Sequence, residues 1–350
     1  MDTDNQTTTI EAEEIETIKN LKILIACSSS EEDSINKILS LGIEAERFPL
    51  SDALQNPQDA FSMKHLKPAI EFAQEGGFDS VLAIDSQQNK FALAVRKSPK
   101  DAFVLLSFHQ LSSLLSVLLL EDHPNLSCEK SIFVTETINK IFERAEKPVK
   151  TLAELVSPLN ENSDMKSVEG EEVLFLSENQ EMLLTGQDNS LDYLIGRLLS
   201  AEIELHEGKK TLFDKLMEIY QSYGFRKEKL MTGDMSSPSQ KKFFTKIMDT
   251  LKKKTPEMIG GSAILSVTDM VKGTSKSKIS GRVTPSEYPE MNAVKVFLSN
   301  GVSFIITPAG EKIIYFLVVE GPLSKKEEYP KVSSAYDARM VKFIGELNRV

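Results

Sequence analysis

The chain has 350 residues, of which 41% are hydrophobic and 27% are charged. This composition supports packed cores and excludes a wholly disordered protein, and the length favours about two or three domains. Because 41 Lys and Arg stand against 52 Asp and Glu, the net charge of −11 disfavours binding to nucleic acid or to an anionic membrane.

The N-terminal 18 residues hold six acidic residues and no aromatic one, which predicts a disordered tail over residues 1–18. They do not show the basic and then apolar pattern of a signal peptide. Cys27 and Cys128 are the only cysteines and lack the spacing of a metal site, which is typical of a reducing compartment. We therefore expect a cytoplasmic protein.

Strands and helices alternate in the first hundred residues. Glycines at 76 and 77 form a typical helix stop, and the alternation predicts a mainly parallel sheet with helices on its faces. The pattern predicts strands at 22–26, 43–48, 81–84 and 91–95 and helices at 34–41 and 63–74.

The alternation then repeats, which predicts a second α/β unit. Residues 103–120 contain no Asp, Glu, Lys or Arg, but they are short of the ~20 residues of a membrane-spanning helix and include four serines. A strand running into a buried helix explains them better. The unit contains strands at 103–106, 131–134 and 173–176, helices at 110–120, 138–145, 191–205 and 211–223, and a polar loop at 161–170.

The pattern changes after Arg226. Ser299-Asn300-Gly301 is a hairpin signal between two apolar runs. Lysines 241, 242, 246, 252, 253 and 254 surround a helix at 243–251, either as its solvated face or as a patch for an acidic partner. The remaining elements are strands at 263–267, 293–298, 302–306 and 313–319 and a terminal helix at 336–347.

Motifs of common active sites are missing from the sequence. It has no phosphate-binding loop, no dinucleotide fingerprint, no H-E-x-x-H and no C-x-x-C. The four histidines, His65, His109, His123 and His206, fall on separate elements, so none is a favoured catalytic base. We therefore predict no catalytic residue.

Three polar strings follow strands: Asp85 to Lys90 (DSQQNK), Ser177 to Gln180 (SENQ) and Thr307 to Lys312 (TPAGEK). With the order of elements, they resemble the metal, sugar and phosphate motifs of the α-D-phosphohexomutase family, the phosphoglucomutases and phosphomannomutases. The resemblance covers roughly residues 20–320 and matches the second, third and fourth family domains. It implies two consecutive α/β domains, at 19–103 and 104–226, and a smaller α+β C-terminal domain at 227–350.

The first string resembles the family's magnesium motif, D-x-D-x-D-R. Asp85 keeps the first carboxylate, whereas Gln87 and Asn89 stand in the other two ligand positions. Amide oxygens carry no charge, and Mg²⁺ relies on carboxylates and phosphate oxygens. We therefore expect a relic metal site and no cofactor, with magnesium relevant only if the chain is an active mutase.

The other two strings resemble substrate motifs. Glu178, Asn179 and Gln180 occupy the sugar-binding G-E-E-S positions, where only the first carboxylate is kept. The family's R-P-S-G-T-x-P loop, which anchors phosphate, corresponds to a string in which threonine replaces arginine, alanine replaces serine, and a glutamate adds repulsive charge. In that string the relic substrate-binding residues are Thr307, Ala309, Gly310 and Lys312.

No string resembles the family's T-A-S-H-N-P phosphoserine loop, and we expect its domain to be missing before Lys22. The sequence therefore predicts a non-catalytic protein that acts by binding a protein partner or as a homo-oligomer, without nucleic acid or membrane partners. One alternative is a hexose-phosphate mutase, an intramolecular phosphotransferase of carbohydrate metabolism that a separate chain completes. A second is a module that binds a sugar phosphate weakly.

Overall fold

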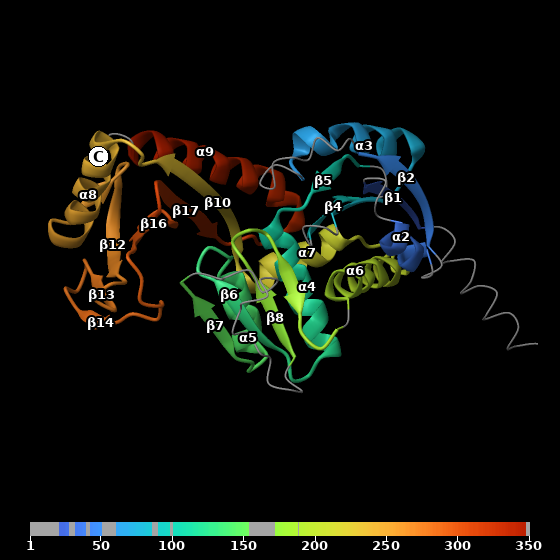
Figure 1. Ribbon diagram of the computed structural model, residues 1–350, viewed down its shortest axis with the longest axis horizontal. Coiled ribbons are helices and arrows are strands. Elements are labelled where there is room, and N and C mark those ends of the chain that lie inside the picture. The colour runs from blue at the N-terminus through green and yellow to red at the C-terminus, as the bar shows by residue number, and fades with distance from the viewer. Residues whose placement is uncertain are drawn as a thin grey trace, which may run out of the picture. The chain divides into compact units, whose positions relative to one another are not determined.

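The computed structural model describes residues 21–27, 32–39, 43–50, 61–85, 90–98, 101–153, 172–187 and 189–347. The predicted tail at 1–18 and the predicted loop at 161–170 lie outside this part. The described residues form two compact units (Figure 1). The first holds Met1–Glu129, Ile138–Val149 and Val156–Glu218, and the second holds Lys130–Thr137, Lys150–Leu155 and Ile219–Val350.

A five-stranded sheet with the order β2-β1-β3-β4-β5 begins the first unit. The predicted strands are present, but the sheet is mixed: β1 runs parallel to β2 and β3, whereas β4 and β5 are antiparallel to their neighbours. The strands are β1 (Lys22–Cys27), β2 (Glu44–Pro49), β3 (Ser80–Asp85), β4 (Lys90–Arg96) and β5 (Phe103–Leu105).

Helix α3 (Met63–Gly76) packs on this sheet through Leu66, Ala69 and Ala73, which recur at helical spacing. It ends where Gly77 adopts a φ of +71°, as the glycine stop predicts. Helix α2 (Glu32–Leu39) contacts α6 (Ser190–Glu207) in the same unit.

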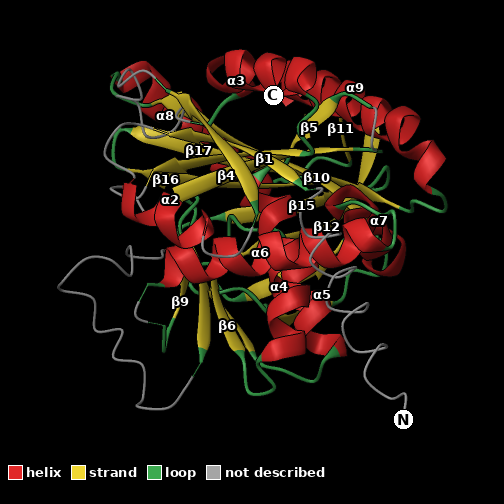
Figure 2. Ribbon diagram, turned by 90° about the vertical axis from the view of Figure 1, so that its right-hand side faces the viewer, coloured by secondary structure: helices red, strands yellow, loops and turns green. Residues whose placement is uncertain are grey.

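The second α/β group has a four-stranded sheet with the order β7-β6-β8-β9, and its helices α4 and α6 contact each other (Figure 2). Sequence patterns predict its helices to within a few residues. The elements are α4 (Phe108–Asp122), β6 (Ser127–Ser131), α5 (Thr137–Arg144), β7 (Val149–Leu152), β8 (Val173–Leu176), β9 (Met182–Leu184) and α7 (Leu212–Tyr223).

Helix α4 explains the long uncharged stretch. Ser107 caps it in a reciprocal pair with Gln110, and its leucines are buried in the first unit. Within the described ranges, no helix is long and apolar enough to cross a membrane.

The C-terminal sheet is antiparallel, with the order β10-β17-β16-β15-β12-β13-β14 and β11 paired to β12. Helix α9 contacts β17 and β10. The elements are β10 (Phe225–Asp234), α8 (Pro238–Lys253), β11 (Met258–Ile259), β12 (Ser262–Asp269), β13 (Thr274–Ser277), β14 (Val283–Pro285), β15 (Val294–Leu298), β16 (Val302–Ala309), β17 (Lys312–Gly321), a 3-10 turn (Lys326–Glu328) and α9 (Tyr329–Leu347).

Two of the expected strands have a different place in the structure. The strand at 103–105 pairs with β4, so it completes the first sheet instead of opening the second. The strand expected at 131–134 is instead β6, which ends at Ser131. Ile132 and Phe133 form a turn and pack in a hydrophobic cluster with Met270, Ala293, Ile305 and Phe316, so their apolar character reflects this core and not strand pairing.

Candidate functional site

The first residue of the expected metal site lies at the end of β3. Asp85 is the last residue of this strand and pairs in register with Lys90, the first residue of β4. Gln87 and Asn89 lie outside the described residues. In the described part of the chain, no three His, Cys, Asp or Glu side chains are grouped closely enough to hold a metal ion.

Glu178, Asn179 and Gln180 form the turn between β8 and β9. The Ser177 hydroxyl organises this turn, because it accepts hydrogen bonds from the backbone N–H groups of Asn179 (3.2 Å) and Glu181 (3.3 Å). Gln180 adopts a left-handed φ of +65°. One carboxylate oxygen of Glu178 is shielded from solvent and has no hydrogen-bond partner among the described residues.

The expected phosphate-anchoring residues form a tight hairpin in the second unit. Ala309 pairs with Lys312, so only Gly310 and Glu311 connect β16 to β17, and Gly310 takes the positive φ of +59° that such turns require. Thr307 is buried, and its hydroxyl donates to the carbonyl oxygen of Asn292 (3.2 Å). Asp85 and the 178–180 turn belong to the first unit.

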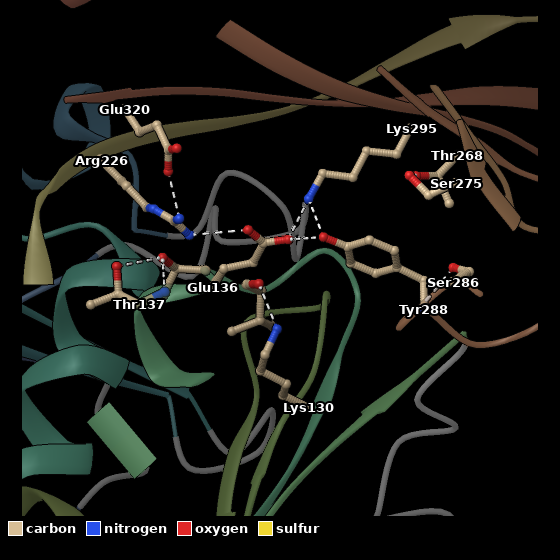
Figure 3. A network of polar contacts seen from close by, with 12 residues as sticks. Lys130, Glu136, Thr137, Arg226, Thr268, Ser275, Ser286, Tyr288, Lys295 and Glu320 are labelled. Carbon is tan, nitrogen blue, oxygen red and sulfur yellow. Dashed lines mark hydrogen bonds and ion pairs between the residues drawn. The ribbon is translucent and has the colours of Figure 1, made fainter. Parts of the chain in front are cut away.

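A polar network that the sequence did not predict lies in the second unit, around Glu136 (Figure 3). Arg226 Nη1 lies 3.2 Å from one Glu136 oxygen, and its other terminal nitrogen is paired with Glu320. Tyr288 donates its hydroxyl to the second Glu136 oxygen at 2.7 Å, and Lys295 donates to both this oxygen and the Tyr288 hydroxyl.

The side chains of this network keep their charges near neutral pH. Burial alone would raise the pKa of Glu136, but the charges of Lys295 and Arg226 outweigh it and lower the pKa to about 2. Burial and the neighbouring Glu136 raise the pKa of Tyr288. Two cations balance two carboxylates, so the network has no excess charge for an anion. It ties the 130–137 segment to the C-terminal sheet.

A second group that the sequence did not predict surrounds a cavity of about 180 Å³ in the first unit. Glu202 lies on its wall and is only 5% exposed. Burial raises the pKa of Glu202 to about 8, and the negative charge of Asp79 acts in the same direction. The guanidinium of Arg96 donates to the carbonyl oxygens of Phe78 (2.6 Å) and Asp101 (2.8 Å), so it is committed to the backbone.

The one buried histidine is also committed to a structural role. His123 Nδ1 lies 2.8 Å from Glu172, and Nε2 lies 2.7 Å from the hydroxyl of Tyr193. Both ring nitrogens therefore have hydrogen-bond partners within the first unit.

Comparison with known proteins gives a consistent result for the fold. No protein-family model matches the sequence, and no curated protein matches it significantly. Among solved structures, parafusin (phosphoglucomutase) from Paramecium matches with a TM-score of 0.59 and 9% identity over 97% of this chain and 61% of its own.

Two further structures match similarly. A putative phosphomannomutase from Thermus thermophilus has a TM-score of 0.52 and 13% identity over 94% of this chain and 64% of its own. A phosphoglucomutase/phosphomannomutase family protein from Burkholderia thailandensis has a TM-score of 0.52 and 10% identity over 95% of this chain and 63% of its own. The chain thus spans less than two thirds of the length of each. It has the fold of part of an α-D-phosphohexomutase.

Glu136 gives a prediction for acid stability. The pKa of Glu136 is about 2 in the folded chain and about 4.3 in the unfolded chain. The ionised side chain therefore stabilises the fold at pH values above about 4.3, and this stabilisation is lost as the pH falls toward about 2. Glu136→Gln should lower the free energy of unfolding by about 2 kcal/mol at pH 7 and flatten its pH dependence between about pH 4.5 and 2. Urea unfolding of the full chain measures both effects. Glu311→Gln, in an exposed turn, is the control, and equal curves for the two variants would contradict this role.

Glu202 gives the opposite pH dependence. Because its folded pKa is raised to about 8, the fold favours the protonated acid, and stability is lost as the pH rises from about 4.5 to 8. Glu202→Gln should therefore stabilise the chain by about 2 kcal/mol at pH 9 and change little at pH 4.5. Unfolding at the two pH values tests this prediction. Glu204→Gln on the exposed side of α6 should show no such difference, and the prediction fails if Glu202→Gln behaves like it.

Proposed function

We propose that this protein uses a phosphohexomutase fold without mutase activity and acts by binding another protein chain. Phosphoryl transfer depends almost wholly on positioning and on neutralising the charge of the transferred group. The residues at the metal, sugar and phosphate motif positions offer little positioning and little charge neutralisation. The β16–β17 turn carries this proposal.

At this turn the family resemblance places the phosphate-anchoring loop. A two-residue connection leaves a short loop for surrounding a phosphate, and the hydroxyl of Thr307 is directed to the Asn292 carbonyl oxygen. The carbonyl oxygen of Glu311 accepts a hydrogen bond from the backbone N–H of Met235 (2.7 Å), which holds the turn against β10. The Glu311 side chain is exposed and repels an anion.

The metal position supports the same proposal. Asp85 has the cationic Lys90 as its cross-strand neighbour, and Lys90 is only 8% exposed. A nearby ammonium group competes with a divalent cation for the same carboxylate. Gln87 and Asn89 would add amide oxygens without charge.

A second candidate function rests on Glu178. Its shielded carboxylate oxygen, which has no hydrogen-bond partner among the described residues, is an acceptor suited to a sugar hydroxyl. This observation favours a module that binds a sugar phosphate without converting it.

We expect no conversion of glucose 1-phosphate in the presence of Mg²⁺ and glucose 1,6-bisphosphate. A coupled assay should give the same background rate for the native chain and for Asp85→Ala, because a working metal site would be needed for any difference. Turnover that Asp85→Ala abolishes would contradict the proposal. Heat on titration with glucose 6-phosphate that Glu178→Ala removes would instead favour the sugar-phosphate module.

Partner binding is expected to involve helix α3 of the first unit. Met63 and Phe72 on α3 are 48% and 40% exposed, and covering them would be favourable at about 25 cal/mol per Å² of apolar area. Light scattering should show a dimer at high concentration, and Met63→Ser/Phe72→Ser should shift it toward the monomer. Leu230→Ser on β10 is the control. A monomer at every concentration would contradict self-association.

A further inference from the structure

The positive charge of this acidic chain is concentrated in its C-terminal part. Residues 219–350 hold 21 Lys and Arg against 13 Asp and Glu, whereas residues 1–218 hold 20 against 39. Ten of the 21 basic residues lie between residues 241 and 282, where only three acidic residues occur. This segment includes α8, β12 and β13, which all belong to the second unit (Figure 1).

The same region exposes large apolar side chains. Ile279 is 79% exposed, which is the highest value for a large apolar residue in the described part of the chain. Met258 is 55% exposed and Val283 is 57% exposed. Exposed apolar side chains that gather in one region, together with lysines, mark a candidate interaction surface.

The β13–β14 hairpin presents Ile279 on a well-ordered tip. The backbone N–H of Ser277 donates to the carbonyl oxygen of Arg282 (2.9 Å), and that of Gly281 donates to the carbonyl oxygen of Ser277 (3.0 Å). The N–H of Ser280 bonds to the Ser277 hydroxyl at 3.2 Å. The turn is thus closed by its own hydrogen bonds, with exposed Lys278 and Arg282 on either side of Ile279.

The end of α8 lies against this tip. Lys278 Nζ donates to the carbonyl oxygen of Thr255 at 3.2 Å, one residue beyond the exposed Lys254. Lys276 pairs in register with Val283 on the hairpin itself. We call the resulting surface the basic tip; its residues are Lys253, Lys254, Met258, Lys276, Lys278, Ile279, Arg282 and Val283.

We propose that the basic tip docks on an anionic lipid surface, with Ile279 entering the headgroup layer and the surrounding cations contacting the lipid headgroups. Each Lys or Arg near such a surface strengthens binding by roughly fivefold. Long basic side chains bury their methylene groups while their charges stay among the headgroups, which suits the alternation of lysine with isoleucine and valine. The hydrogen-bonded turn holds Ile279 outward before docking, so little conformational entropy is lost.

A fluid lipid layer fits this surface better than a folded partner or a nucleic acid. The apolar side chains protrude singly, so a protein partner would need a separate pocket for each, whereas a headgroup layer yields wherever they enter. Residues 241–283 contain two aromatic residues, Phe243 and Phe244, and Phe244 is buried, so there is no platform for stacking bases. The edge strand β14 carries no lysine and exposes Val283, so the basic residues do not serve to block strand pairing at this edge.

The net charge of −11 predicts no attraction to an anionic membrane, but it is an average over the whole chain. Screening limits electrostatic interactions in solution to about 8 Å at physiological ionic strength. A lipid surface that meets the basic tip therefore senses the five cations there and their neighbours Asp249 and Glu257.

Sedimentation of the full chain with lipid vesicles tests this proposal. We expect binding to phosphatidylcholine vesicles with about 30% phosphatidylserine, little binding to pure phosphatidylcholine, and weakening by salt. Lys278→Glu/Arg282→Glu should reduce binding at least tenfold, and Ile279→Ser should reduce it severalfold. Matched controls are Lys325→Glu/Lys342→Glu for charge and Leu230→Ser for an exposed apolar residue, and both should bind as the native chain does.

Absence of binding to the anionic vesicles would overturn the proposal. It would also be overturned if Ile279→Ser bound as tightly as the native chain while only the charge variants lost affinity, since this pattern describes general attraction to an acidic macromolecule. Thermal unfolding of each variant establishes that the fold is intact, as expected for substitutions at exposed positions.

Discussion

The carboxylate of Glu136 determines how the 130–137 segment is held in the second unit. The Glu136 side chain is 32% exposed, and even partial removal of a carboxylate from water is unfavourable unless charges and hydrogen bonds compensate. Here Arg226, Lys295 and Tyr288 approach from three separate parts of the C-terminal domain and meet at its two oxygens. The adjacent Ile132 and Phe133 can therefore stay in the apolar cluster of that domain while the chain turns into α5.

Architecture and active-site chemistry have different requirements in this chain. The sheet order and helix packing need apolar residues at the right period, and these residues are present, as the match to phosphohexomutase structures indicates. Phosphoryl transfer needs ionised groups at a few turns. Thr307 shows the difference, because it continues β16 well and its hydroxyl has a backbone partner, but it has no charge with which to hold a phosphate.

Sequence patterns predicted the elements that depend on local periodicity. Helices α4 and α6 are long and rich in apolar residues, α4 on nearly all sides, so the local sequence predicts both. Strand β10, in contrast, was not predicted, because its sequence FRKEKLMTGD is mostly charged and polar, and its conformation depends on pairing with β17. The apolar run Ile132–Val134 was wrongly predicted as a strand for a related reason. Residues buried in a tertiary cluster and residues buried in a sheet show the same apolar pattern in the sequence.

The polar sites show the same limit. No local motif could predict a network that joins Glu136 to Arg226, Tyr288 and Lys295, since about 90 to 160 residues separate Glu136 from these partners. Glu202 did leave a signal, because it follows Leu198 by four residues on the buried stripe of α6, where an acid is unusual. Whole-chain net charge is an average that hides the contrast between the two parts of the chain. Electrostatic interactions in water are screened beyond about 8 Å at physiological ionic strength, so the partners of a surface depend on the charges that lie near it, and here the two parts of the chain carry opposite net charges.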